Sequence, residues 1–231
     1  MQNLTLVFDL DGTLVDTAPD LVAATNHVLE HMGVAPIDEA TLRPVIGHGA
    51  RYMIERAMGP AGENLSPAQR DGLVERFLDY YGRHIAVGSR PFDGAVAALE
   101  RFQTQGARLG VCTNKYERMS KRLLDTLDLT RFFSAVAGRD TLSAFKPHPE
   151  HLLGTIRMAG GDASRAVMIG DSRVDVATAR AAGVPVIAVS FGYTDAPARE
   201  FEADAVIDHY DELEPAVAAL LASRSCVDGV R

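Results

Sequence analysis

Six short apolar runs, rich in β-branched residues, constrain the fold of this chain more than any other feature. They lie at residues 4–8, 109–112, 135–137, 167–169, 186–189 and 205–207. Apolar residues at helical spacing separate most of them, as Val96, Leu99 and Phe102 do. Strands that alternate with helices predict an α/β protein with a Rossmann-like, mainly parallel sheet and helices on both faces.

One interval interrupts this alternation. Residues 17–88 contain no convincing strand, whereas apolar residues recur at helical spacing from Leu21 to Met32, just before Gly33. The sequence therefore predicts an all-helical domain at residues 17–88, inserted into a core formed by residues 1–16 and 89–231. Polar, Gly and Pro residues flank the insert and predict hinges there.

Charge and composition limit the partners of the chain. The formal net charge of −8 argues against nucleic-acid and anionic-membrane surfaces, although it leaves a small anionic substrate open. No apolar run approaches the ~20 residues that span a bilayer, and a signal-peptide pattern is missing, so we expect a cytoplasmic protein. Cys112 and Cys226 lie far apart, which suggests no disulfide framework. We expect a monomer or a homodimer.

The segment DLDGT places two carboxylates at the end of the first predicted strand. Asp9 and Asp11 are two residues apart, so their side chains emerge on the same side. Their repulsion requires a cation or a shared proton. A solvated Asp-Gly turn of a hairpin is the alternative, but the following segment shows no return strand.

A second acidic pair follows another predicted strand in GDSRVD. Asp171 lies at the strand end, and Asp175 lies one helical turn later. Helix capping by Asp171 or Ser172, with Asp175 near the helix N-terminus, is the alternative interpretation. Carboxylates that converge from two strand ends favour Mg²⁺, which binds protein carboxylates, water and substrate phosphate.

Two other predicted loops carry polar groups suited to phosphoryl oxygens. Thr113 and Asn114 end one strand, and Lys146 lies in the loop before the helix that follows the next strand. Taken alone, Thr-Asn is more often a helix N-cap, and a lysine before proline is usually solvated.

These segments, in this order, resemble the motifs of the haloacid dehalogenase superfamily of phosphohydrolases. The motifs are DLDGT, CTN, KP and GDSRVD, and the resemblance covers essentially the whole chain. It implies that Asp9 is the nucleophile that forms an aspartyl-phosphate and that Asp11 is the general acid and base. Thr13 would position Asp11, while Thr113 and Lys146 would hold the phosphoryl oxygens, with Asn114 beside them.

The same resemblance implies a Mg²⁺ site. Asp9, the main-chain carbonyl of Asp11 and Asp171 would bind the ion, and Asp175 would bind or orient it. The true dehalogenases of the superfamily lack the second aspartate, so Asp11 favours phosphate chemistry.

The helical insert resembles the cap of one large subgroup, in which the cap closes over the site. Within that subgroup, segments such as VIGHGA and VCTNK are similar to the phosphoglycolate phosphatase subfamily, which implies 2-phosphoglycolate as substrate. A cap loop made of Gly47, His48 and Gly49 would face the site, with His48 as a candidate substrate contact.

Other functions share most of these residues. A pyrophosphatase, a sugar phosphate or bisphosphate phosphatase and a β-phosphoglucomutase-like enzyme would keep the same acids and differ in the cap. A regulatory module that binds phosphate without turnover is the non-enzymatic alternative. We favour hydrolysis of a small anionic phosphomonoester, without a nucleic-acid or membrane partner.

Overall fold

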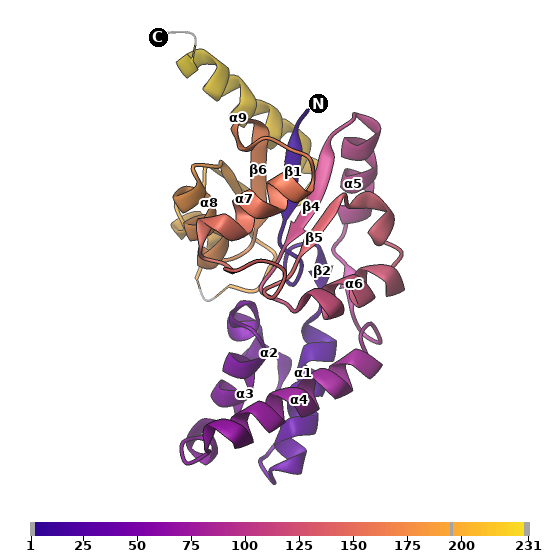
Figure 1. Cartoon of the computed structure of the whole chain (residues 1–231), viewed down its shortest axis with the longest axis vertical. Coiled ribbons are helices and arrows are strands. Elements are labelled where there is room, and N and C mark those ends of the chain that lie inside the picture. The colour runs from indigo at the N-terminus through magenta and orange to yellow at the C-terminus, as the bar shows by residue number, and fades with distance from the viewer. Residues whose placement is uncertain (1–2, 195, 229–231) are drawn as a thin grey trace.

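The computed structural model describes residues 3–194 and 196–228 and contains a six-stranded parallel sheet (Figure 1). The strand order is β5-β4-β1-β6-β7-β8. The strands are β1 (Thr5–Phe8), β4 (Arg108–Cys112), β5 (Ala135–Ala137), β6 (Ala166–Gly170), β7 (Val186–Val189) and β8 (Ala205–Ile207). Each coincides with one of the six apolar runs to within a residue, which confirms the predicted fold class.

Helices cover both faces of the sheet because its strands are apolar on both sides. In β1, Leu6 and Phe8 belong to one hydrophobic cluster, whereas Val7 belongs to the other. The first cluster includes α5 (Ala95–Thr104), α6 (Glu117–Thr126) and α9 (Leu213–Asp228), and the second includes α7 (Pro149–Met158) and α8 (Arg173–Ala182). Short 3-10 helices occupy Thr130–Phe132, Ala163–Arg165, Ala198–Glu200 and Tyr210–Glu212.

Four helices, here called the cap helices, gather at one end of the molecule beyond the sheet (Figure 1). They are α1 (Ala18–His31), α2 (Glu39–Leu42), α3 (Ala50–Met58) and α4 (Pro67–Arg83), with 3-10 helices at Arg43–His48 and Gly59–Gly62. No strand lies between residues 17 and 89, a stretch that the structure describes throughout. These helices fall within the predicted insert, whose domain boundaries remain a prediction.

Two short linkers join the cap helices to the core side by side. Strands β2 (Val15–Asp16) and β3 (Arg90–Pro91) pair antiparallel, so the chain enters and leaves the cap helices at adjacent positions. The buried Asp20 carboxylate accepts hydrogen bonds from the Gly88 and Ser89 N–H groups, both 2.8 Å, and from the Ser89 hydroxyl. One side chain therefore fastens the returning linker to the first turn of α1.

We expect Asp20→Ala to lower the free energy of unfolding by about 1–3 kcal/mol, because the buried Ser89 N–H would lose its acceptor. Urea denaturation followed by circular dichroism measures this change. Asp79→Ala, which removes an exposed carboxylate paired with Arg83, is the matched control and should change stability by no more than about 0.5 kcal/mol. Equal effects of the two substitutions would contradict a special role for Asp20.

The C-terminal segment is more helical than the sequence predicts. Residues 222–231 stand at the end of the chain and predict a frayed tail, but α9 continues to Asp228, while residues 229–231 lie outside the described part. Cys112 is buried with a free thiol, and the side chain of Cys226 is not among those described. None of the helices described in the structure has the length and apolar character needed to traverse a bilayer.

Candidate active site

The carboxyl ends of three neighbouring strands carry the candidate catalytic residues. Asp9 follows β1, Thr113 follows β4 and Asp171 follows β6, and these strands are adjacent because β1 pairs with both others. Lys146 reaches the same place from the loop before α7, and all four side chains are buried. The structure therefore brings together residues that are more than 160 positions apart in the sequence.

Lys146 is the central cation of this site. Its Nζ lies 3.0 Å from Asp9 Oδ2 and 2.6 Å from Asp175 Oδ1. Burial alone would lower the pKa of Lys146, but the carboxylates of Asp175 and Asp9 raise it overall. Lys146 is therefore a permanent positive charge beside the predicted nucleophile.

Asp175 combines two roles that the sequence allowed for it, helix capping and a contact within the candidate site. Its Oδ2 accepts hydrogen bonds from the Ser172 N–H and hydroxyl, and Ser172 is the N-cap of α8, so helix capping is present. Its Oδ1 is held by Lys146. Asp175 therefore caps α8 and orients Lys146 at the same time.

Three buried carboxylates form a potential cation site. One oxygen from each of Asp9, Asp171 and Asp175 lies within 4.8 Å of the others. Burial raises the pKa of Asp9 to about 6, and burial followed by the charges of Asp175 and Asp9 raises the pKa of Asp171 well above its usual value. Lys146 offsets only one of three negative charges, so this oxygen donor set suits a hard divalent cation such as Mg²⁺.

Asp171 is held by two hydrogen bonds. The Thr13 hydroxyl donates to Oδ1 over 2.9 Å, and the Tyr193 N–H donates to Oδ2 over 2.7 Å. Thr13 was expected to position Asp11, but in this structure its hydroxyl contacts Asp171. Gly12, with φ of +81°, approaches the same carboxylate so closely that a Cβ would collide with it.

Asp11 faces a lysine that was not among the predicted site residues. Lys115 Nζ lies 2.9 and 3.1 Å from the two Asp11 oxygens, and the Thr17 hydroxyl donates to Asp11 Oδ1. The same ammonium lies 4.4 Å from the centre of the Tyr81 ring of α4. Lys115 follows Thr113 and Asn114 directly. This position beside a predicted motif was the sequence signal that could have identified Lys115 as a site residue.

Asn114 and His151 hold the Lys146 loop. The Asn114 amide donates to the Lys146 carbonyl over 3.2 Å, and the Lys146 N–H donates to His151 Nδ1 over 3.2 Å. Burial, followed by the charge of Lys146, lowers the pKa of His151 to about 4, so its ring is neutral near pH 7. Asn114 thus contacts the loop of Lys146, and it is also one of the residues that line the cavity described next.

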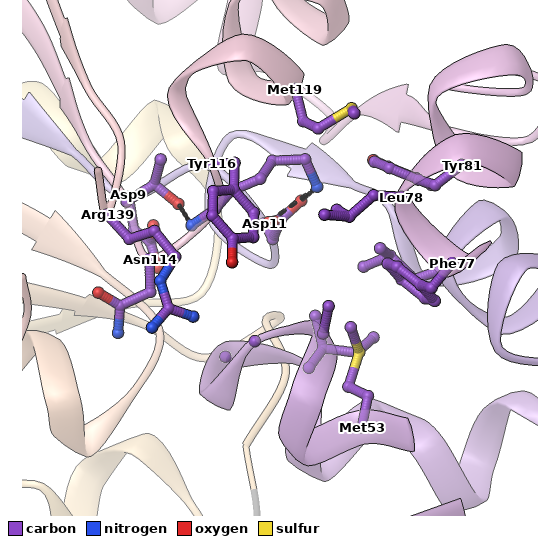
Figure 2. Close-up of a pocket in the computed structure, with 17 residues that line it drawn as sticks. Asp9, Asp11, Met53, Phe77, Leu78, Tyr81, Asn114, Tyr116, Met119 and Arg139 are labelled. Carbon is purple, nitrogen blue, oxygen red and sulfur yellow. Dashed lines mark hydrogen bonds and ion pairs between the residues drawn. The ribbon is translucent and has the colours of Figure 1, made fainter. Parts of the chain in front are cut away.

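A cavity lies between these residues and the cap helices. In Figure 2, Asp9, Asn114 and Arg139 lie on one side, while the cap contributes an apolar wall. The residues of that wall are Met53, Phe77, Leu78 and Tyr81, together with Leu21 and Ile46. The cavity is therefore charged on the core side and largely apolar on the cap side.

The predicted cap loop lies at the cavity, but its three residues differ in position. Gly47 and Gly49 line the cavity. The His48 ring stacks on Tyr52 with centroids 4.7 Å apart and lines a neighbouring hollow beside Ser172. His48 is not among the residues that line the cavity with Asp9, Asp11 and Thr113.

Tyr193 connects the Asp171 carboxylate to the start of the cap. The main-chain N–H of Tyr193 donates to Asp171. The Tyr193 hydroxyl donates to Asp16 Oδ1 over 2.6 Å and accepts from the N–H groups of Thr17 and Ala18. Asp16 also pairs with Arg43 of the cap over 2.8 Å. Asp16 therefore links Tyr193 of the core to Arg43 of the cap at the start of the insert.

Comparisons with known proteins give a consistent result. A model of the haloacid dehalogenase-like hydrolase family matches residues 6–189. A phosphoglycolate phosphatase of Mesorhizobium japonicum is 53% identical over 208 residues, which are 90% of this chain and 92% of that protein. A phosphoglycolate phosphatase of Agrobacterium fabrum is 46% identical over 218 residues, 94% of each chain.

A solved structure is similar over the same extent. The crystal structure of a predicted phosphoglycolate phosphatase from Haemophilus somnus has a TM-score of 0.85 and 28% sequence identity, covering 93% of this chain and 97% of that one. The similarity therefore includes both the sheet and the cap helices.

Proposed function

This chain belongs to the haloacid dehalogenase-like hydrolase family, and on that premise we propose that it hydrolyses 2-phosphoglycolate to glycolate and phosphate. The relatives named phosphoglycolate phosphatase support the substrate. The observation that carries the chemistry is the buried Asp9 carboxylate, which lines the cavity with Lys146 3.0 Å behind it. The chain is thus a phosphatase whose site lies between the sheet and the cap helices.

In the first proposed step, an Asp9 oxygen attacks the phosphorus atom. A bond forms between the carboxylate oxygen and phosphorus, and the bond from phosphorus to the glycolate oxygen breaks. Asp11 donates a proton to the departing oxygen, which leaves as the hydroxyl of glycolate. Lys146 and Thr113 offset charge on the phosphoryl oxygens, so that an anionic nucleophile can approach an anionic phosphate.

In the second proposed step, water attacks the same phosphorus atom of the aspartyl-phosphate. Asp11, now unprotonated, accepts a proton from the water, and the bond between Asp9 and phosphorus breaks to release phosphate. The Leu10 N–H donates to Asp9 Oδ1 over 2.7 Å, which keeps the carboxylate in one orientation for both steps. The apolar wall of the cap limits access of bulk water during the first step.

The cofactor that fits the carboxylate set is Mg²⁺. We propose that Asp9, Asp171 and the Asp11 main-chain carbonyl hold it, with Asp175 acting through Lys146 and Ser172. When bound, it supplies positive charge to the phosphate and to the buried carboxylates.

Phosphate release from equal concentrations of 2-phosphoglycolate, pyrophosphate and several sugar phosphates tests this proposal. We expect 2-phosphoglycolate to have the highest kcat/KM with Mg²⁺, and excess EDTA to lower the rate on the order of 100-fold or more. Readdition of Mg²⁺ is the control and should restore the rate.

Each other outcome points to an alternative. A preference for pyrophosphate or a sugar phosphate would replace the substrate but keep the reaction class. Conversion of a sugar 1-phosphate to its isomer would indicate a mutase. Phosphate binding without release from any ester would indicate a regulatory module and contradict the proposal.

A further inference from the structure

Two cationic side chains, Lys115 and Arg139, line the core side of the cavity, and Lys146 lies beside Asp9; the two lysines already have carboxylate partners. Lys146 pairs with Asp9 and Asp175, and Lys115 pairs with Asp11. Arg139 also lines the cavity, but among the described residues no carboxylate lies within ion-pair distance of its guanidinium. Arg139 is therefore the cation with capacity for an additional anion.

The position of Arg139 is fixed by its surroundings. Arg139 stands two residues after β5, and its main-chain N–H donates a hydrogen bond to the Lys115 carbonyl over 3.0 Å. Its guanidinium carbon lies 5.4 Å from the centre of the Tyr116 ring and 4.8 Å from that of Phe145. The Phe145 side chain is 46% exposed, so it borders the guanidinium at the surface. Aromatic contacts on a planar guanidinium leave its N–H edges free for hydrogen bonds.

The cap approaches Arg139 at Gly49. Gly49 has φ of +89°, and a Cβ at this position would lie 3.4 Å from Arg139 Nη1. Gly49 is also the N-cap of α3, and both Gly49 and Ala50 line the cavity. The first N–H groups of a helix lack acceptors within the helix and carry partial positive charge. Arg139 and the start of α3 therefore present donors to the same part of the cavity.

We propose that Arg139, assisted by the N-terminus of α3, binds the carboxylate of the substrate. This inference rests on the proposed function, because 2-phosphoglycolate carries an anion at each end. Asp9, Thr113 and Lys146 define the end of the site that binds the phosphoryl group. Arg139 would bind the carboxylate at the other end of the substrate. A guanidinium suits a carboxylate because two parallel N–H groups can donate to its two oxygens. Arg139 thus selects esters whose leaving group carries a carboxylate.

The kinetics of two substrates test this role. 2-Phosphoglycolate carries the carboxylate, and 2-hydroxyethyl phosphate replaces it with a neutral CH₂OH group. We expect Arg139→Met to lower kcat/KM for 2-phosphoglycolate by about 10- to 100-fold, mainly through KM, with less than about a twofold change for 2-hydroxyethyl phosphate. Arg139→Lys keeps the charge without the two-pronged geometry and should fall between the wild type and Arg139→Met.

Arg131→Met is the matched control. Arg131 also lies over an aromatic ring, Phe132, but in the 3-10 helix that precedes β5, away from the cavity. We expect it to leave both substrates unaffected. Equal losses for both substrates in Arg139→Met would show a structural role and overturn the inference, as would unchanged kinetics with 2-phosphoglycolate. If the wild type releases no phosphate from 2-phosphoglycolate, the proposed function itself fails, which is a separate outcome.

Discussion

Replacement of Asp9 by asparagine is expected to lower the rate of phosphate release by on the order of 10⁴-fold or more, because the amide cannot form the bond to phosphorus. The fold should persist. The wild-type carboxylate is buried and its pKa is raised to about 6, so removal of its charge relieves a desolvation cost. Steady-state phosphate release and a thermal unfolding curve measure the two effects on the same sample.

Two further variants complete this test. Asp9→Ala removes the possibility that slow deamidation of the asparagine regenerates the nucleophile. Asp125→Asn changes an aspartate of α6 that hydrogen-bonds Thr130 at the surface, and it should retain full activity. Turnover at the wild-type rate by folded Asp9→Ala would rule out the aspartyl-phosphate route.

Replacement of Lys146 by methionine is expected to lower both stability and activity. The substitution would leave the carboxylates of Asp9 and Asp175 buried without their shared cation, and loss of one partner of a buried ion pair costs about 3–5 kcal/mol. The rate should fall on the order of 10²- to 10³-fold, because the phosphoryl oxygens lose a positive charge. Urea unfolding and phosphate release measure the two losses.

Lys121→Met is the control for this variant. Lys121 is 58% exposed and pairs with Glu117 at the surface, so we expect a change of less than about 1 kcal/mol and full activity. If Lys146→Met is too unstable to purify, Lys146→Arg retains the charge and should recover most of the stability but less of the activity. Unchanged stability in Lys146→Met would contradict the central place given to this cation.

The positions of the acidic residues could be predicted because parallel topology leaves little freedom. Once six apolar runs alternate with helices, their carboxyl ends must share one edge of a sheet, and Asp9 and Asp171 stand directly at such ends. Lys146 and Thr113 are in loops that leave the same edge. Topology was sufficient to bring these residues to one edge of the sheet, whereas the roles expected for Thr113 and Lys146 came from the family resemblance.

The residues that connect the core to the cap could not be predicted in this way. Asp20, Lys115 and Tyr193 act through contacts with chain segments 68 to 177 residues away, and no local spacing encodes such contacts. Strands β2 and β3 have two residues each, too few for a periodic pattern. Their contacts depend on how the helices dock on the sheet, which one sequence does not specify.

The side-by-side linkers make the cap helices an exchangeable module. Because β2 and β3 are neighbours, the chain enters and leaves residues 18–88 at a single junction, and exchange of this stretch would not alter strand order in the sheet. Such an exchange would replace the apolar wall of the cavity and the start of α3, but Arg139 and Lys115 would remain with the sheet. Recombination at this junction can therefore change the shape of the leaving group that is accepted while preserving a preference for its charge.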